Sequence, residues 1–201
     1  MIKNIVFDLG KVLVDFHPTE GMKKMGFSKE AINCFEKNIF SGLWEECDRN
    51  PLGDKEIRAL FKQRVKGYER EVDMLWDNLW DVTGVYAYSH EWILSLKKRG
   101  YKVFILSNFG QRSFEINSHL YTFLEDVDGL LISYEIGKIK PEPEIYEALL
   151  ERYSFSAKES VFIDDRKINV DAAILCGMKG IVFDGYEKTQ QKLNRLLEEQ
   201  D

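Results

Sequence analysis

Three apolar stretches of the chain end in small polar residues that could bind a metal ion or a phosphate group. Asp8 ends NIVFD, Ser107 and Asn108 end KVFILSN, and Asp164 and Asp165 end SVFIDD. In open parallel α/β sheets, ligands bind outside the carboxyl ends of the strands. If the three stretches are strands of one sheet, these side chains lie together at its ligand-binding edge.

Three carboxylates at one edge repel each other, so the arrangement requires positive charge among them. Mg2+ prefers oxygen ligands and is usually held by one or two carboxylates, water and substrate phosphate. Lys140, in GKIKPEPEIY, precedes a predicted helix that would pack on the same sheet, and it would add a second cation. An Asp beside such cations can attack phosphorus and form an aspartyl phosphate. The residues therefore predict a phosphoryl-transfer site.

The elements that would position these residues alternate between strands and helices. Continuous apolar runs, typical of strands buried on both faces, occur at residues 4–8, 102–108, 129–133, 160–165 and 180–184. Helical patterns occur at residues 88–99, 143–152, 167–176 and 187–198. This order predicts an α/β fold built on a doubly wound parallel sheet.

Residues 17–84 break the alternation, because they contain no convincing strand and are rich in helix formers and bulky apolar side chains. We interpret them as a helical insertion whose Trp and Phe side chains form its own core. Residues 1–16 and 85–201 would then form the α/β core. Since the chain leaves the core after its first strand, the insertion would lie as a lid over the carboxyl edge of the sheet.

The composition restricts the classes of partner. The chain has 201 residues, with 28 Lys plus Arg against 34 Asp plus Glu and a net charge of -6, which argues against nucleic acid. The N-terminal apolar run is too short for a signal peptide, and no window is long enough to span a bilayer. Cys34, Cys47 and Cys176 are odd in number and lack metal-type spacing, which fits reduced thiols. We therefore expect a cytoplasmic protein without a nucleic-acid or membrane partner.

Four short motifs follow one another along the chain: IVFD with Asp8, FILSN with Ser107, KPEPEIY with Lys140 and Tyr146, and IDDRKINVDAA with Asp164 and Asp165. Each motif is weak alone, but the four in this order resemble the haloacid dehalogenase (HAD) superfamily over nearly the whole chain. The resemblance implies a Rossmann-like core. It also makes residues 17–84 similar to the small helical cap of that superfamily.

The resemblance implies roles for the residues that match the motifs. Asp8 would be the nucleophile. Lys140 would orient and neutralise Asp8 and the transferring phosphoryl group. Ser107, together with the backbone of Asn108, would bind that phosphoryl group.

The resemblance also implies Mg2+ as the cofactor and a small phosphorylated metabolite as the substrate. The metal ligands would be the carboxylates of Asp8 and Asp165 and the backbone carbonyl of Gly10. Asp164 and Asn169 would bind water on the metal.

Gly10 departs from the superfamily pattern, because most of its phosphatases have a second Asp at this position that serves as general acid and base. Such catalysis typically contributes about a hundred- to ten-thousandfold in rate. The combination of DLGKV with a paired Asp164 and Asp165 is similar to the glucose-1-phosphatase type, whose DLG first motif commonly reads DLGNV. A sugar phosphate is therefore among the expected substrates.

Three functions remain open from the sequence. The leading hypothesis is a Mg2+-dependent phosphatase that acts through an aspartyl phosphate on Asp8. The alternative, favoured by Gly10, is a catalytically weak or inactive protein that binds a phosphorylated ligand or a partner. A 2-haloacid dehalogenase is less favoured, because Asp164 and Asp165 are paired and residues 20–48 contain no Arg to bind halide.

Four polar residues close to the motifs have simpler interpretations. We expect Lys11 to face solvent, although it could instead place a cation near the phosphate. Asp15 and His17 are expected to mark the hinge where the chain enters the insertion. Arg112 follows the second motif and is expected to be exposed.

Overall fold

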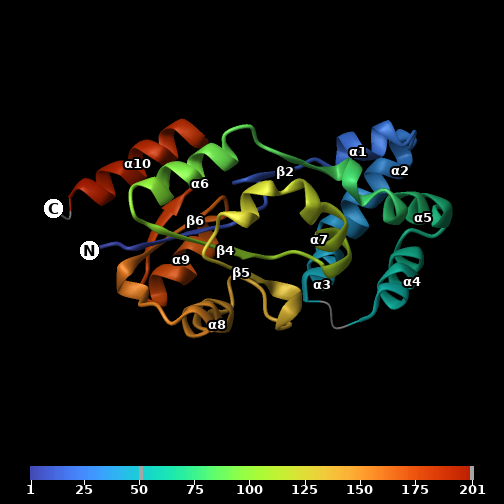
Figure 1. Cartoon of the computed structure of the whole chain (residues 1–201). Coiled ribbons are helices and arrows are strands. Elements are labelled where there is room, and N and C mark those ends of the chain that lie inside the picture. Colours follow the sequence, from blue (N-terminus) through green and yellow to red (C-terminus); the bar gives the residue numbers. More distant parts are fainter. Residues whose placement is uncertain (50–51, 200–201) are drawn as a thin grey trace.

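The computed structural model describes residues 1–49 and 52–199 (Figure 1). Five strands form the central sheet: β1 (Asn4–Phe7), β4 (Lys102–Ser107), β5 (Gly129–Ile132), β6 (Ser160–Asp164) and β7 (Lys179–Val182). Their order is β5-β4-β1-β6-β7, and every neighbouring pair is parallel. The predicted α/β fold with a parallel sheet is confirmed, and β1 lies at the centre of the sheet.

Helices cover both faces of the sheet (Figure 1). One face is covered by α6 (Ser89–Lys98), α7 (Gln111–Asn117) and α10 (Tyr186–Glu198), and the other by α8 (Pro143–Tyr153) and α9 (Lys167–Leu175). In β1, Ile5 and Phe7 pack in the cluster that contains Trp92 of α6, whereas Val6 packs in the cluster that contains Tyr146 of α8. Successive strand residues point to opposite faces, so an uninterrupted apolar run is the pattern of a strand covered on both sides. Short 3₁₀ turns occur at Ser118–Leu120, Thr122–Glu125, Ser133–Glu135 and Ala157–Glu159.

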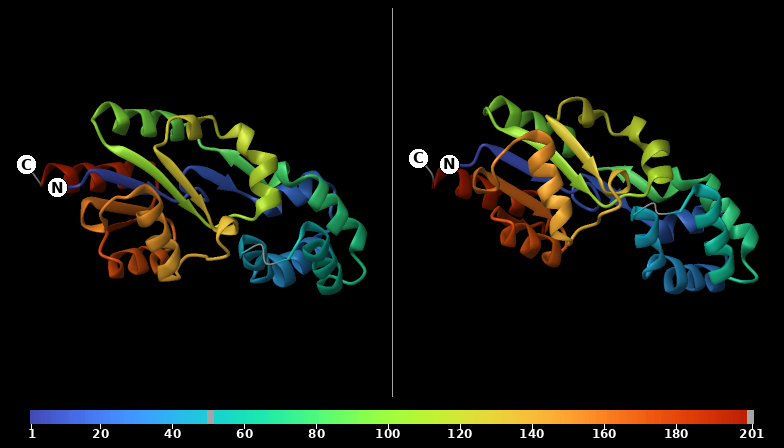
Figure 2. Two further views of the ribbon diagram at one scale, coloured as in Figure 1. Left: turned by 60° about the horizontal axis from the view of Figure 1, so that its bottom comes forward. Right: turned by 90° about the horizontal axis from the view of Figure 1, so that it is seen from below.

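The helical insertion lies between β1 and α6 in the sequence, at the far end of the molecule from the N-terminus and α10 (Figures 1 and 2). Its helices are α1 (Pro18–Lys24), α2 (Lys29–Phe35), a π-helical segment (Glu36–Phe40), α3 (Leu43–Arg49), α4 (Asp54–Arg64), α5 (Glu69–Asp77) and a 3₁₀ turn (Leu79–Val82). Ser28 begins α2 as its N-cap, where its Oγ accepts a hydrogen bond of 3.1 Å from the Ala31 N–H.

A two-stranded antiparallel ribbon, β2 (Val14–Phe16) and β3 (Thr83–Val85), connects the core to the insertion. The expectation that residues 17–84 contain no strand is therefore wrong for Thr83 and Gly84, which belong to β3. A three-residue strand containing a glycine leaves no apolar run, and its partner lies far away in the sequence. Local sequence patterns consequently do not reveal it.

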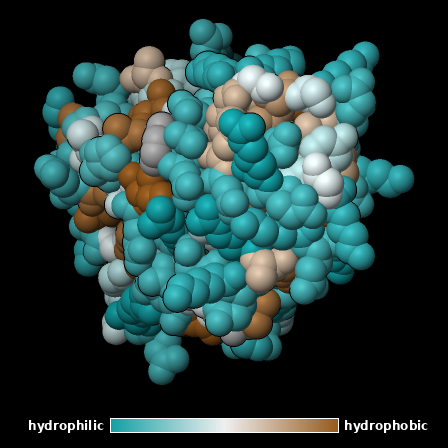
Figure 3. Space-filling view, turned by 90° about the vertical axis from the view of Figure 1, so that its right-hand side faces the viewer, coloured by the Kyte–Doolittle hydropathy of each residue, from teal (hydrophilic) through white to brown (hydrophobic). Residues whose placement is uncertain are grey.

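The insertion has a hydrophobic cluster of its own, with Phe35, Ile39, Phe61 and Val72 fully buried. The expectation that its bulky side chains form its core holds for these residues, whereas the side chain of Trp80 lies outside the described part of the chain. The face of the molecule formed by the insertion is mostly hydrophilic, and hydrophobic side chains show only in small separated areas (Figure 3). Within the described residues, no helix combines the length and hydrophobicity needed to cross a membrane.

Candidate active site

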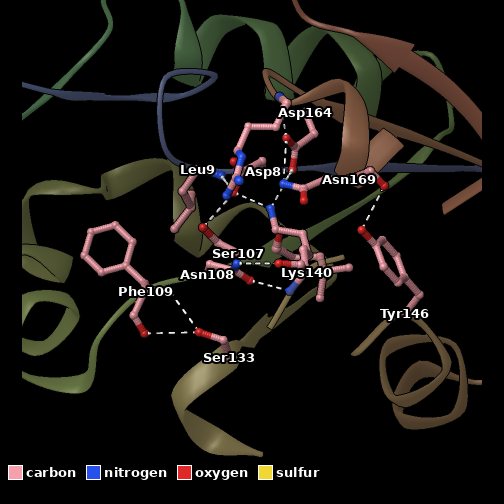
Figure 4. Close-up of polar contacts among 12 residues, drawn as sticks. Asp8, Leu9, Ser107, Asn108, Phe109, Ser133, Lys140, Tyr146, Asp164 and Asn169 are labelled. Carbon is pink, nitrogen blue, oxygen red and sulfur yellow. Dashed lines mark hydrogen bonds and ion pairs between the residues drawn. The ribbon is translucent and has the colours of Figure 1, made fainter. Parts of the chain in front are cut away.

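Asp8 directly follows β1, at the carboxyl edge of the sheet (Figure 4). Its backbone N–H continues the pairing with β6 by donating to the Ile163 carbonyl at 2.9 Å. Its Oδ1 accepts hydrogen bonds of 2.7 Å from both the Leu9 N–H and the Ser107 hydroxyl, and lies 2.7 Å from Lys140 Nζ. Ser107 is the last residue of β4, so two adjacent strands and a lysine fix the same carboxylate.

Lys140 reaches Asp8 from the loop before α8, and its side chain is only 1% exposed. Its Nζ also lies 2.7 Å from Asp164 Oδ2 and donates to the Leu106 carbonyl at 3.0 Å. An ammonium group has three donors, and all three find acceptors here. Burial alone would lower the pKa of Lys140, but the neighbouring carboxylates of Asp164 and Asp8 raise it above its ordinary value. The lysine therefore stays charged.

The pKa of Asp8 responds to the same surroundings. Burial raises it to about 6, with Lys140 acting against the shift and Asp164 adding to it. The carboxylate is thus still ionised at neutral pH, as a nucleophile must be.

Asp164 is fully buried at the end of β6 and faces Lys140. Its oxygens also accept hydrogen bonds from the Arg166 N–H at 2.8 Å and from Asn169 Nδ2 at 3.0 Å. The Asn169 backbone is fixed in turn by the Tyr146 hydroxyl, which donates to its carbonyl at 2.8 Å. Asn169 Oδ1 is buried and has no hydrogen-bond partner among the described residues. Asp164 thus holds Lys140 in place, while Asn169 keeps one acceptor free beside the site.

The Asn108 side chain is committed to the backbone of Lys140, to which it makes two hydrogen bonds. Next to it, the Phe109 N–H donates to the Ser133 hydroxyl at 3.0 Å. The side chain of Asn108, whose backbone is expected to bind the phosphoryl group, therefore organises the loop that carries Lys140 (Figure 4).

The donor set fits a hard divalent cation. Oxygen atoms of Asp8, Asp164 and Asp165 all lie within 4.8 Å of one another. Burial, and then the charge of Asp164, raises the pKa of Asp165, and the charges of Lys11, Lys140 and Arg166 only partly offset that rise. Both carboxylate oxygens of Asp164 already accept hydrogen bonds, whereas the contacts described for Asp8 use only Oδ1, which favours Asp8 and Asp165 over Asp164 as metal ligands. Carboxylate oxygens joined by a backbone carbonyl, as at Gly10, are typical Mg2+ ligands.

A cavity of about 180 Å³ lies over these residues, between the core and the insertion. Asp8, Gly10, Asn108, Lys140, Asp165 and Asn169 line it from the core. Trp44, Glu45 and Asp48 line it from the insertion, and Phe16 lines it from β2 of the ribbon. Asp48 was not singled out from the sequence, because it lies in WEECDR among other charged residues and carries no motif.

The four other polar candidates lie around the site but outside its hydrogen-bond network. Lys11 lines the cavity, is exposed and has a positive φ of 58°. Asp15 Oδ2 in β2 lies 3.0 Å from His17 Nδ1, and Asp15 Oδ1 accepts a hydrogen bond of 3.1 Å from the hydroxyl of Tyr86, which directly follows β3. Arg112 is exposed, as expected, and lines a separate cavity.

Residues 2–177 match the haloacid dehalogenase-like hydrolase family. The chain belongs to this family. The resemblance stated from the four motifs is thereby confirmed for the HAD family, and TM-scores of 0.73 and 0.80 with solved HAD structures confirm the fold.

Three relatives that match most of this chain are named as phosphatases. A D-ribitol-5-phosphate phosphatase from Bacteroides thetaiotaomicron is 29% identical over 192 residues, which are 85% of this chain and 86% of the relative. A HAD-family enzyme from the same organism, solved in complex with magnesium and inorganic phosphate, is 27% identical with a TM-score of 0.72, covering 90% of this chain and 94% of that one. A HAD-like hydrolase from Porphyromonas gingivalis is 25% identical with a TM-score of 0.80, covering 98% of both chains.

Proposed function

We propose that this HAD hydrolase is a Mg2+-dependent phosphomonoesterase acting on a small phosphorylated metabolite. The observation that carries the proposal is the carboxylate of Asp8, fixed by Lys140 and Ser107 at the floor of a cavity and beside Asp165. The phosphatase activity named for the D-ribitol-5-phosphate relative and the magnesium and phosphate bound by the Bacteroides HAD enzyme support it.

In this proposal Asp8 attacks the phosphorus of the ester, so that a carboxylate–phosphorus bond forms while the bond to the leaving oxygen breaks. Water then attacks the aspartyl phosphate, which releases inorganic phosphate and regenerates Asp8. Lys140 keeps Asp8 ionised and aimed, and Ser107 and the Asn108 backbone hold phosphoryl oxygens. Mg2+, held by Asp8, Asp165 and the Gly10 carbonyl, supplies charge neutralisation when bound.

The insertion supports a cap role in the proposal. Residues 17–84 would close the site above residues 1–16 and 85–201, since Trp44 and Asp48 line the same cavity as Asp8. Ion pairs between Arg49 and Glu142 and between Glu45 and Arg166 join the insertion to the core. A cavity of this size suits a small metabolite. The DLG motif and paired Asp residues support a sugar phosphate or related polyol phosphate.

Hydrolysis of p-nitrophenyl phosphate with and without Mg2+ tests the proposed function. We expect turnover with Mg2+, its loss with chelator, and its abolition in Asp8→Asn. Activity that survives Asp8→Asn would contradict the nucleophile. Halide release from a 2-chloro acid that is insensitive to chelator would instead indicate a dehalogenase.

The second candidate is a phospho-ligand-binding protein with little catalysis, which Gly10 favours because no side chain there can donate a proton. Binding of phosphorylated metabolites with Mg2+, without turnover of any of them, would support it. Screening such metabolites for both phosphate release and thermal stabilisation separates the two candidates.

A further inference from the structure

Asp48 brings a carboxyl group from the insertion into the cavity of Asp8. It lies on α3, is 7% exposed, and lines the cavity together with Asp8, Lys140 and Asn108. The cavity has a volume of about 180 Å³ and is lined by residues of both the core and the insertion. A phosphate ester bound on Asp8 would therefore contact side chains on both walls.

The position of Asp48 is set by its backbone. Its carbonyl accepts a hydrogen bond of 2.6 Å from the buried Ser133 hydroxyl, which itself accepts one from the Phe109 N–H. Phe109 immediately follows Asn108, so α3 is fixed against the loop that closes the phosphate end of the site. The contact to Ser133 uses the backbone carbonyl, so the carboxyl group is engaged separately, by a hydrogen bond from the backbone N–H of Gly110.

The surroundings of the Asp48 carboxyl favour its neutral form. Burial is the main cause that raises its pKa to about 8, and the charges of Glu45 on the same helix and Asp8 across the cavity add to the shift. Lys140 and the backbone N–H of Gly110 act in the opposite direction. The nearest basic residue in the sequence, Arg49, is paired with Glu142 instead. Asp48 therefore holds a proton at neutral pH.

Gly10 leaves a place in the site where a proton donor is missing. Its backbone does not have a left-handed φ, and a Cβ at this position would meet nothing within 4 Å. Neither conformation nor packing thus requires glycine. A proton for the leaving group must consequently come from another side chain or from water.

Resting on the proposed phosphatase function, we propose that Asp48 is the catalytic residue that donates the proton to the leaving group and later accepts one from water. In the first step, Asp8 bonds to phosphorus, the ester P–O bond breaks, and the Asp48 proton moves to the departing oxygen. In the second step, the Asp48 carboxylate takes a proton from the attacking water. As the water oxygen bonds to phosphorus, the bond between phosphorus and Asp8 breaks. Asp8 is then free again, and Asp48 is again protonated.

Asp48→Asn tests this role, because it keeps the shape of the side chain and the backbone contact to Ser133. General acid catalysis contributes about a hundred- to ten-thousandfold in rate. The leaving alkoxide of glycerol phosphate needs a proton, so kcat for this ester should decrease by a factor in that range. With p-nitrophenyl phosphate, the phenolate leaves without help, so the variant should give a burst of phenolate followed by slow turnover. Glu46→Gln, an exposed neighbour outside the cavity, is the matched control and should behave as the unmodified protein.

A second experiment introduces a proton donor at residue 10, on the core side of the cavity. Gly10→Asp in the Asp48→Asn background should recover turnover of glycerol phosphate by about a hundredfold, the lower end of the general-acid range. Gly10→Asn in the same background has nearly the same shape without the proton and should recover none.

The outcomes separate this inference from the proposed function. If the unmodified protein hydrolyses neither ester with Mg2+, the proposed function fails. If it does hydrolyse them and Asp48→Asn changes only KM, or lowers kcat equally for both esters without a burst, Asp48 is a binding or structural residue and this inference is overturned.

Discussion

The side chain of Asn108 binds both backbone groups of Lys140. Its Oδ1 accepts a hydrogen bond of 2.8 Å from the Lys140 N–H, and its Nδ2 donates one of 3.0 Å to the Lys140 carbonyl. Asn108 directly follows β4, so this pair of bonds attaches the lysine loop to the sheet edge that also carries Ser107. The buried lysine thus reaches Asp8 from a backbone position that Asn108 defines.

Asn108→Asp should reduce turnover more than substrate binding. The aspartate can still accept from the Lys140 N–H but cannot donate to its carbonyl, so the lysine shifts. A misplacement of about 1 Å can lower a rate by roughly a hundredfold, and the unsatisfied carbonyl should destabilise the fold by about 1–3 kcal/mol. Steady-state kinetics and thermal unfolding measure the two effects.

Asn38→Asp is the control for this prediction. Asn38 Nδ2 donates to the Cys34 carbonyl at 2.8 Å within the insertion, outside the hydrogen-bond network of Asp8 and Lys140. Loss of this hydrogen bond should lower the free energy of unfolding without lowering kcat. Equal losses of kcat in the two variants would show that Asn108 does not act by positioning Lys140.

Lys140→Met should destabilise the protein at neutral pH. The substitution leaves the carboxylates of Asp8 and Asp164 buried without their shared cation, and breaking a buried ion pair in this way costs about 3–5 kcal/mol. The loss should shrink as the pH falls and Asp8 takes up a proton. Chemical unfolding at neutral and mildly acidic pH measures it.

Lys138→Met provides the matched comparison two residues away. Lys138 forms an exposed pair with Glu144 at 3.4 Å, and pairs of this kind contribute about 0–1 kcal/mol. A stability loss in Lys140→Met no larger than that of Lys138→Met would contradict the buried-pair interpretation.

The strands of the core were predictable because burial on both faces gives each an uninterrupted apolar run. Parallel topology then brought Asp8, Ser107 and Asp164 to one edge without any further information. The ribbon of β2 and β3 was not predictable, because its pairing joins short segments about seventy residues apart in the sequence. Long-range pairs of this kind leave no local period.

The presence of Asp48 in the site was also not predictable from the sequence. Its position depends on how α3 lies against Ser133 and Gly110, and a helical pattern does not specify which acidic residue turns inward. The side-chain role of Asn108 was also missed, since its motif indicates a phosphate contact but not two bonds to the Lys140 backbone.

Mg2+ should raise the thermal stability of the unmodified protein, and Asp165→Asn should remove most of that increase. A ligand that binds only the folded state stabilises it by about 2.7 kcal/mol at a hundred times its Kd. Asp184→Asn is the control, because Asp184 is exposed and paired with Lys192 at 3.1 Å. Thermal unfolding over a Mg2+ titration measures the effect, and an unchanged response in Asp165→Asn would exclude this residue as a ligand.

Asp48→Asn should make the protein more stable than the unmodified chain at alkaline pH. The pKa of Asp48 is raised from 3.8 to about 8 by burial and by the charges of Glu45 and Asp8, so the folded state holds this proton more tightly than the unfolded chain does. The contribution of Asp48 to the free energy of unfolding is therefore largest below about pH 4 and is lost as the pH rises through about 8. Asparagine has no proton to lose, so the difference in unfolding free energy between variant and unmodified protein should grow in favour of the variant over this range.

Denaturant unfolding from pH 4 to pH 9, with Glu46→Gln as the control, measures that difference. A difference that stays constant with pH would mean that Asp48 ionises as easily in the folded protein as in water, and the carboxyl could then not carry the proton that the leaving group requires.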